Sequence, residues 1–483
     1  MELVIILVIP LIVAALSLVP TKKATLASGL TTLGAALIFL LCLHTIWDLG
    51  QGKEVIVLGL DGWLSCDGLS GLIMLLVSFV GFTAALFSWG YIEQGTGAEG
   101  MRKARRYYFQ YNLFLLSMLA VPLLAQVALV WIAVELTTLL SVFLVGFENR
   151  AEALEAAWKY VVLTCMGAAL ALMGVLILYW GLTLSGGDGF TWSGLLAASP
   201  RIPPVFLKIA FLFILVGFGT KAGLVPMHTW LPDAHSQAPS PVCALLSGVE
   251  TTTALYVIIR LLPLFQGVSV QSASTWLIVF GLISTGTAAF LLIQVRDYKR
   301  LFAFSTIEHM GIILVAAGLG QAVHLGAVYQ ILTHAVTKSF CFFAAGLVLL
   351  ITGRREMSSV RGLVRISPLT GVSLMVAGLA IAGAPPFAVF LSELSIIKAG
   401  IAAGQYWVIG GLTLFIIIAF CGIMYQVNRM VFGQHLDSPG LPTVPLACKL
   451  AILLAVIPVV VLGLYLPQPL NNLMRFAALA LGR

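Results

Sequence analysis

The chain has 483 residues, of which 60% are hydrophobic and only 9% are charged, and its formal net charge is +7. Because soluble domains carry roughly 25% charged residues, this composition excludes a soluble enzyme. Apolar runs of about 20 residues, the length that a helix needs to cross the hydrocarbon core of a bilayer, recur along the chain. The sequence therefore predicts an all-α polytopic membrane protein.

Each hydrophobic run is taken as one predicted membrane crossing, which gives about fourteen transmembrane helices. In chain order the runs are 3–20, 26–47, 66–90, 108–125, 127–147, 157–181, 205–225, 241–265, 274–295, 302–319, 324–352, 370–402, 407–433 and 446–466. Basic residues gather in the loops of one side, as at 102–106, 296–300 and 354–365. The positive-inside rule assigns that side to the cytoplasm, which predicts a protein of the cell inner membrane with both termini outside the cytoplasm. The net charge thus reflects topology, and we expect no nucleic-acid partner.

Cofactor and metal motifs are not evident in the chain. The seven cysteines are scattered singly, without a Cys-x-x-Cys pair, which argues against an iron–sulfur cluster or a zinc site. The glycines between Gly217 and Gly223 lie inside an apolar run and lack the spacing of a dinucleotide-binding loop. We expect no cofactor and no metal in this chain, and no catalytic residue.

Ionisable residues inside the predicted crossings are few, and each costs about 3 kcal/mol or more at mid-bilayer, so each is a candidate functional residue. The predicted proton-translocation residues are Glu135, Lys221, Glu250, Glu308, His309, His334, Lys338 and Glu393. Glu135 has apolar residues on both sides, and its two alternatives are a proton-relay carboxylate and an ion pair that only packs helices. In either case the expected partner is Lys221.

Two crossings contain helix-breaking residues close to these charges. Pro226 follows Lys221 by five residues, and Pro385 and Pro386 precede Glu393 by about two turns. A broken helix persists in a membrane where its freed backbone is buried in protein or faces a water-filled cavity. We predict helix breaks at these prolines, and their separation by five crossings suggests an internal inverted repeat.

The remaining polar positions extend this pattern. His334 and Lys338 are four residues apart and share one helix face. Glu250 lies among threonines, about 15 Å into its predicted helix. His228, Asp233 and His235 have the residue types of a metal site, but Pro232 interrupts them and a third strong ligand is lacking. They are interpreted as the place where protons come in from the cytoplasmic side.

The segment from Lys221 to Pro239, KAGLVPMHTWLPDAHSQAP, resembles the seventh-helix signature of a known family. This family comprises the antiporter-like subunits of respiratory complex I, of energy-converting hydrogenases and of multisubunit sodium/proton antiporters. The resemblance covers about residues 107–432. The motifs at 306–311 and 134–138 are most similar to those of the hydrogenase 4 F subunit group.

The resemblance implies fourteen helices with two inverted five-helix repeats and discontinuous seventh and twelfth helices. It also implies that Glu135 is the fifth-helix glutamate, Lys221 the central lysine, Lys338 the eleventh-helix lysine and Glu393 the exit residue. The implied divisions are an N-terminal three-helix segment (1–106), a first repeat (107–273), a second repeat (274–433), and a C-terminal helix and tail (434–483).

One position departs from the family pattern. Thr252 stands where the middle subunit of complex I has an eighth-helix lysine. Two alternatives follow for proton transfer there: Glu250 substitutes for that lysine, or water between the threonines carries the proton.

The predicted function is that of a proton-translocating membrane subunit of a redox-driven respiratory complex. Iron–sulfur clusters and a NiFe centre or flavin are expected in partner subunits. The expected partners are antiporter-like paralogues, other membrane subunits, a peripheral redox arm and membrane lipid. The alternatives are a subunit of a sodium/proton antiporter, the membrane partner of an inorganic-carbon uptake system, and a purely structural spacer.

Overall fold

The computed structural model describes residues 2–20, 25–50, 55–58, 62–92, 97–187, 189–265, 271–434 and 443–482. Within these ranges, eleven helical segments are long and apolar enough to cross a membrane, and Glu2–Ser17 and Pro368–Ile381 form shorter apolar helices. The expected all-helical membrane architecture is confirmed in this coarse form.

The N-terminal part contains four helices and a hairpin that the sequence did not predict. Its elements are α1 (Glu2–Ser17), α2 (Thr25–Gly50), β1 (Val55–Leu58), β2 (Leu64–Asp67), α3 (Gly68–Ile92) and α4 (Gly97–Leu123). The two strands pair antiparallel, with Val55 opposite Asp67 and Leu58 opposite Leu64. The described chain is otherwise all-helical, as expected, and in this hairpin a connection between two membrane helices pairs its backbone groups with each other.

The middle of the chain begins with long helices and then becomes segmented. Its elements are α5 (Val127–Val145), α6 (Ala151–Leu184), α7 (Trp192–Ala198), α8 (Pro204–Ala222), α9 (Trp230–Gln237), α10 (Ser240–Leu245), a π-helical segment η3 (Leu246–Glu250) and α11 (Thr251–Arg260). Short 3-10 turns lie at Ser199–Arg201, Met227–Thr229 and Leu262–Phe265.

The C-terminal part has the same mixture of long and interrupted helices. Its elements are α12 (Gln271–Gln294), α13 (Tyr298–Gly318), α14 (Gln321–Thr352), a 3-10 turn (Met357–Ser359), α15 (Leu363–Ile366), α16 (Pro368–Ile381), α17 (Ala388–Ala402), α18 (Tyr406–Phe432), α19 (Leu446–Leu464) and α20 (Gln468–Leu481).

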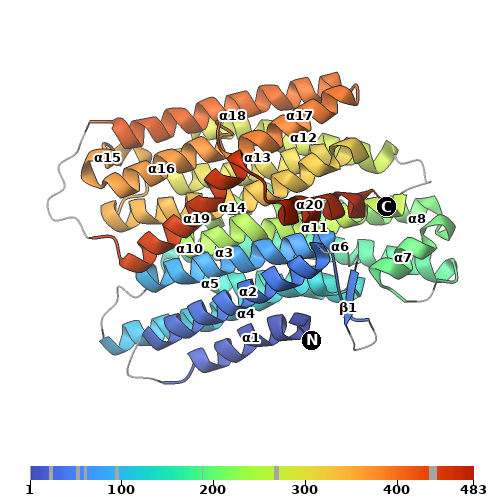
Figure 1. The fold of residues 1–483 in the computed structure, drawn as a ribbon, viewed down its shortest axis with the longest axis horizontal. Coiled ribbons are helices and arrows are strands. Elements are labelled where there is room, and N and C mark those ends of the chain that lie inside the picture. The colour runs from blue at the N-terminus through green and yellow to red at the C-terminus, as the bar shows by residue number, and fades with distance from the viewer. Residues whose placement is uncertain are drawn as a thin grey trace.

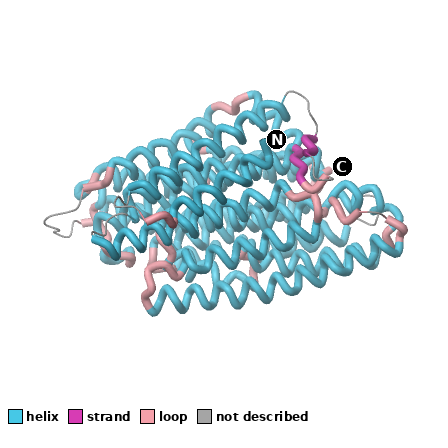
Figure 2. The backbone as a smooth tube through the Cα atoms, turned by 90° about the horizontal axis from the view of Figure 1, so that it is seen from below, coloured by secondary structure: helices cyan, strands magenta, loops and turns pink. Residues whose placement is uncertain are grey.

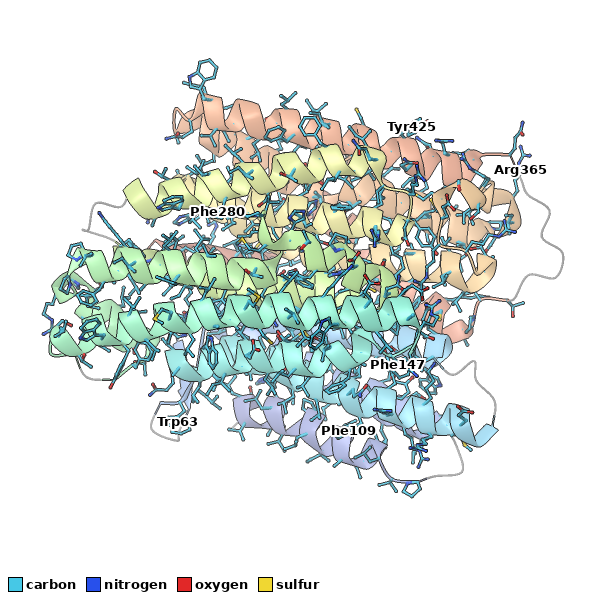
Figure 3. The ribbon with its side chains drawn as sticks, turned by 180° about the vertical axis from the view of Figure 1, so that it is seen from behind. Trp63, Phe109, Phe147, Phe280, Arg365 and Tyr425 are labelled. Atoms are coloured by element: carbon cyan, nitrogen blue, oxygen red, sulfur yellow. The ribbon has the colours of Figure 1, made fainter. Side chains whose placement is uncertain are left out.

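The long helices lie side by side along one direction, and the loops gather at the two ends of the bundle (Figures 1 and 2). Both chain ends, the hairpin, α7 and α20 lie at one end (Figure 1). Arg365 lies at the end opposite to Trp63 of the hairpin connection (Figure 3). The two marked chain ends therefore lie at the same end of the bundle (Figure 1).

The helices that carry most of the ionisable residues are the innermost ones. The apolar segments within Ser240–Phe265 and Tyr298–Gly318 are almost fully buried. The helices α2, α6, α18 and α19 instead expose large apolar side chains. A polar group inside the bundle can find protein partners that lipid cannot offer. The fold therefore places the candidate residues where their charge can be stabilised.

An ion pair joins separate elements at the end of the bundle that carries both termini. The Arg260 guanidinium donates to Asp67 through Nη1 to Oδ1 at 3.1 Å and Nη2 to Oδ2 at 2.7 Å. It also lies over the rings of Trp192 and Tyr256. Burial acts to raise the pKa of Asp67, but the Arg260 charge and hydrogen bonds from Arg260 and Ser70 outweigh it and hold this pKa below its usual value. The pair ties β2 to α11.

Lys299 differs from its expected place in a cytoplasmic loop, because its side chain is fully buried at the start of α13. Its Nζ donates to the Ser236 carbonyl at 3.2 Å and to the Ala238 carbonyl at 2.5 Å. These carbonyls lie at the C-terminal end of α9, where backbone acceptors lack helical partners. Lys299 thus caps α9.

Candidate functional site

The first break separates α8 from α9. Gly223 has a φ of +80° and the Val225–Pro226 peptide bond is cis. The Leu224 amide donates to the Gly219 carbonyl at 2.8 Å, which closes the end of α8. Glycine adopts this left-handed conformation without steric cost, and it ends helices in this way. Lys221 consequently lies in the last turn of α8.

The second break, between α16 and α17, has the same local design. Gly383 has a φ of +75° and the Pro385–Pro386 bond is cis. The Ala384 amide donates to the Leu379 carbonyl at 2.9 Å, in the register of the first break. A methyl group at Gly383 would overlap the Glu393 carboxylate, so the glycine makes room for that side chain.

Lys221 forms a buried ion pair with Glu250. The two atoms, Lys221 Nζ and Glu250 Oε1, are 3.1 Å apart, and their side chains are 4% and 0% exposed. The Lys221 ammonium also donates to the Thr138 hydroxyl of α5. The expected pairing of Lys221 with Glu135 is therefore wrong for this structure. The π-helical segment brings Glu250 next to Lys221 at the end of α8.

Glu135 instead faces α6. The Cys165 thiol donates to Glu135 Oε1 at 3.0 Å, and Glu135 Oε2 has no hydrogen-bond partner within the described residues. Glu135 is half-buried. It lies one turn of α5 from Thr138, the residue that contacts Lys221.

Several hydroxyl groups surround the Glu250 carboxylate. Glu250 Oε1 lies 2.8 Å from the Tyr160 hydroxyl, 3.1 Å from that of Thr137 and 3.4 Å from that of Ser141. Glu250 Oε2 lacks a partner in the described part of the chain. A buried charge needs such additional donors, since pairing alone seldom offsets its desolvation. The second oxygen is open to a proton or a water molecule.

The π-helical segment joins this pair to the other half of the molecule. His334 Nε2 of α14 lies 3.0 Å from the Ser247 carbonyl, and the Ser247 hydroxyl lies 2.6 Å from that of Thr306 on α13. Gly248 permits the close approach, because a Cβ there would lie 3.1 Å from the Ala335 carbonyl. Such π segments occur often at functional sites.

Thr252 uses its hydroxyl within its own helix, donating to the Gly248 carbonyl at 3.0 Å. Of Glu250 and Thr252, Glu250 is thus the residue in contact with Lys221.

Two histidines lie next to each other beyond the π segment. The ring centroids of His309 and His334 are 5.2 Å apart, and both side chains are fully buried. His309 Nε2 lies 3.2 Å from the Ile381 carbonyl at the end of α16. His334 Nδ1 has no partner among the residues described. The two histidines lie between the π segment, which contacts His334, and the end of α16, which contacts His309.

Lys338 and Glu308 lie near each other without forming an ion pair in the described structure. Lys338 Nζ donates at 2.6 Å both to the Phe302 carbonyl and to the Ser305 hydroxyl. Glu308 Oε2 has no hydrogen-bond partner within the described residues.

The three residues predicted to take up protons have different surroundings. Asp233 lies between Lys159, at 3.3 Å, and Arg300, and so joins α6, α9 and α13. His235 is fully buried, with Nδ1 2.8 Å from the Leu231 carbonyl. His228 is half-buried. No group of three or more potential metal ligands was found in the described part of the chain.

Some residues of the site were not found by reading charges alone. Tyr160, Ser247, Gln330 and Ser392 contact the charged residues or link them. Gln330 and Ser392 are polar groups in apolar helices, a signal that the sequence does contain. Tyr160 carries no such signal, because tyrosine is ordinary in a membrane helix.

The fold and the site define a polytopic helical membrane protein with two broken helices and a buried series of ionisable side chains. Residues 125–419 match the model of the transmembrane family described as NADH:quinone oxidoreductase/Mrp antiporter. This chain belongs to that family, as the sequence resemblance indicated.

Individual relatives agree with this assignment. The chain is 36% identical over 375 residues to a Hydrogenase-4 component F homolog of Methylacidiphilum infernorum, covering 76% of this chain and 79% of the relative. It is 28% identical over 432 residues to NADH-quinone oxidoreductase subunit N of Desulforudis audaxviator, covering 86% and 84%. Its fold is similar to a chain of the membrane-bound sulfane sulfur reductase, an archaeal respiratory membrane complex, with a TM-score of 0.87, 24% identity, and coverage of 99% and 96%.

Proposed function

We propose that this protein is the proton-translocating membrane subunit of a redox-driven respiratory complex. The observation that carries the proposal is a series of buried polar groups that extends from the first break to the second. The Lys221–Glu250 pair lies in one half, the π segment links it to His334, and His309 and Glu393 flank the second break.

Lys221 switches between two carboxylates in this proposal. The state described here has Glu250 as partner, and Glu135 lies one helical turn away from the lysine's other contact. A nearby carboxylate favours the charged form of a lysine, and its departure favours release of the proton. The released proton then passes by way of His334 and Lys338 to Glu393, and Glu308 with His309 adjusts the charge along this route.

The proposed topology has fourteen crossings. The eleven apolar segments of the described chain account for most of them, and α1, α4 and the α16–α17 pair supply the rest. The proposed location is the inner membrane. With the basic loops on the cytoplasmic side, both termini lie on the opposite side of that membrane.

The proposed repeats are residues 107–273 and 274–433, between the N-terminal segment 1–106 and the C-terminal part 434–483. Their support is the identical register of the hydrogen bond at the left-handed glycine of each break. A carboxylate, Asp233 or Glu393, also follows each of these glycines by ten residues. Asp233 with His228 and His235 is the proposed place of proton uptake.

The names of the relatives support partners for this subunit. They are a hydrogenase component, a quinone oxidoreductase subunit and part of a respiratory membrane complex. We infer that this chain assembles with antiporter-like paralogues and with a peripheral arm that holds iron–sulfur clusters and a NiFe centre or flavin. Neither a sodium/proton antiporter nor an inorganic-carbon system is favoured by these relatives.

The experiment uses inside-out membrane vesicles that contain the native complex. We expect the vesicle interior to acidify when hydrogen, formate or NADH is supplied as electron donor, in a manner lost on deletion of this chain. A sodium gradient imposed without a donor should move no protons through it. Proton movement driven by sodium alone would identify an antiporter instead.

A further inference from the structure

A buried glutamine connects His309 to the helix that carries Glu393. Gln330 lies on α14, and its Nε2 is 3.4 Å from His309 Nδ1. Its Oε1 accepts a hydrogen bond from the Ser392 hydroxyl at 2.5 Å. The Thr333 and Ser392 hydroxyls are 2.9 Å apart. All four side chains are fully buried, and Ser392 is the residue before Glu393.

The donors and acceptors of this chain fix the form of His309. The Ser392 hydroxyl has two acceptors within reach, Gln330 Oε1 and the Val389 carbonyl, and when it donates to the nearer one, Oε1, the amide turns its NH2 group toward His309 Nδ1. That nitrogen must then be the unprotonated one, and Nε2 carries the hydrogen that it donates to the Ile381 carbonyl. Thr333 in turn donates to Ser392. His309 is therefore neutral, with every hydrogen bond running in one direction.

A proton arriving at His309 Nδ1 is incompatible with this arrangement. Two donors, the new N–H and the Gln330 NH2 group, would face each other. The conflict is removed if the amide turns over, so that Oε1 accepts from His309 and NH2 donates to Ser392. Ser392 then loses its amide acceptor and donates to the Val389 carbonyl, which lies 2.8 Å away. Donor and acceptor thus exchange places in the His309–Gln330 bond and in the Gln330–Ser392 bond, which reaches α17.

We propose that Gln330 is a positioning residue whose amide turns over with each protonation of His309 and transmits that event to α17 beside Glu393. The inference rests on the proposed function and adds a residue to it. The amide itself neither gains nor loses a proton. The other titratable groups that act on His309 are His334, whose ring adjoins it, and Lys338.

Removing the amide tests this role. In Gln330→Met the side chain keeps a similar size but offers no donor and only a weak acceptor. We expect about a tenfold fall in protons moved per donor oxidised, within the range by which coupling residues act, while donor oxidation continues. Gln110→Met is the matched control, because Gln110 is a buried glutamine on α4 outside this chain of bonds, and it should stay within twofold of the native protein.

Two further variants separate positioning from packing. Ser392→Ala removes only the hydroxyl, and combining it with Gln330→Met should lower pumping no further than Gln330→Met alone. In Gln330→Glu an ionised carboxylate accepts from protonated His309 and stabilises it, so the pH profile of pumping should move upward by about one unit. Loss of packing alone would not move that profile.

The proposal would be overturned by native pumping in Gln330→Met, by additive losses in the double variant, or by an unmoved profile in Gln330→Glu. Lys221→Ala, measured in the same vesicles, distinguishes a failure of the role of Gln330 from a failure of the proposed function. If Lys221→Ala stops pumping while the Gln330 variants pump normally, only the role of Gln330 fails. If Lys221→Ala also pumps normally, the proposed function fails.

Discussion

Glu250 shows how a charge is kept inside this bundle. Three hydroxyl groups and the Lys221 ammonium lie around one of its oxygens. Moving either charge out of water costs several kcal/mol, which the contacts must offset. The sequence identified both residues as buried charges, but it suggested the wrong pair. Which carboxylate faces a lysine depends on packing between helices distant in the sequence, and no local pattern encodes that packing.

The energetics of this pair can be tested separately from transport. Lys221→Met leaves an unpaired buried carboxylate and should destabilise the protein by about 3–5 kcal/mol. Adding Glu250→Met removes the unpaired charge, so the double variant should recover most of the loss. Thermal unfolding of the purified complex in detergent measures both. A double variant that is less stable than either single variant would contradict the account.

The breaks between α8 and α9 and between α16 and α17 are the elements best anticipated by the sequence. Glycine and proline punctuate the chain there, and their backbone requirements are local. The hairpin, the π segment and α20 were not anticipated. The hairpin has only four-residue strands. The π segment lies inside a continuous apolar run, where only tertiary contacts such as those of Ser247 distinguish it from an ordinary α-helix.

Matched glycine substitutions test the second break. Gly383 and Gly404 both have left-handed backbones, with φ of +75° and +74°, so an alanine at either should cost about 1–2 kcal/mol of stability. Only at Gly383 does the new methyl group meet the Glu393 carboxylate, whereas Gly404 has open space. We expect Gly383→Ala to lower pumping severalfold and Gly404→Ala to preserve it. Equal pumping in the two variants would show that the second break plays no part in proton transport.

At the scale of the whole molecule, the buried polar series depends on helices from both halves. α5, α8 and the π segment supply its first part, and α13, α14 and α17 supply the second. Composition predicted the membrane class, and the spacing of apolar runs predicted the helices. Ser247 links the two parts of the series, and Gln330 links α13 and α14 to α17 within the second part. Both residues are uncharged, which is why a search for charges did not find them.

The sidedness of the bundle is a second property at this scale. Both termini lie at the end opposite to Arg365 (Figures 1 and 3). Alkaline phosphatase, which is active only outside the cytoplasm, should therefore be active when fused after residue 483. Fused after residue 354, in a basic loop, it should be inactive. The reverse pattern of activity would invert the proposed topology.

The most direct measurement is the ratio of protons moved to donor oxidised in vesicles that carry Lys221→Ala. Lys398→Ala is the control, because Lys398 is an exposed lysine on α17. The account predicts that donor oxidation continues in both variants, and that proton movement falls at least about tenfold in Lys221→Ala, as expected when a transport residue held in a broken helix is lost. A proton-to-donor ratio in Lys221→Ala equal to that of the native complex would contradict it.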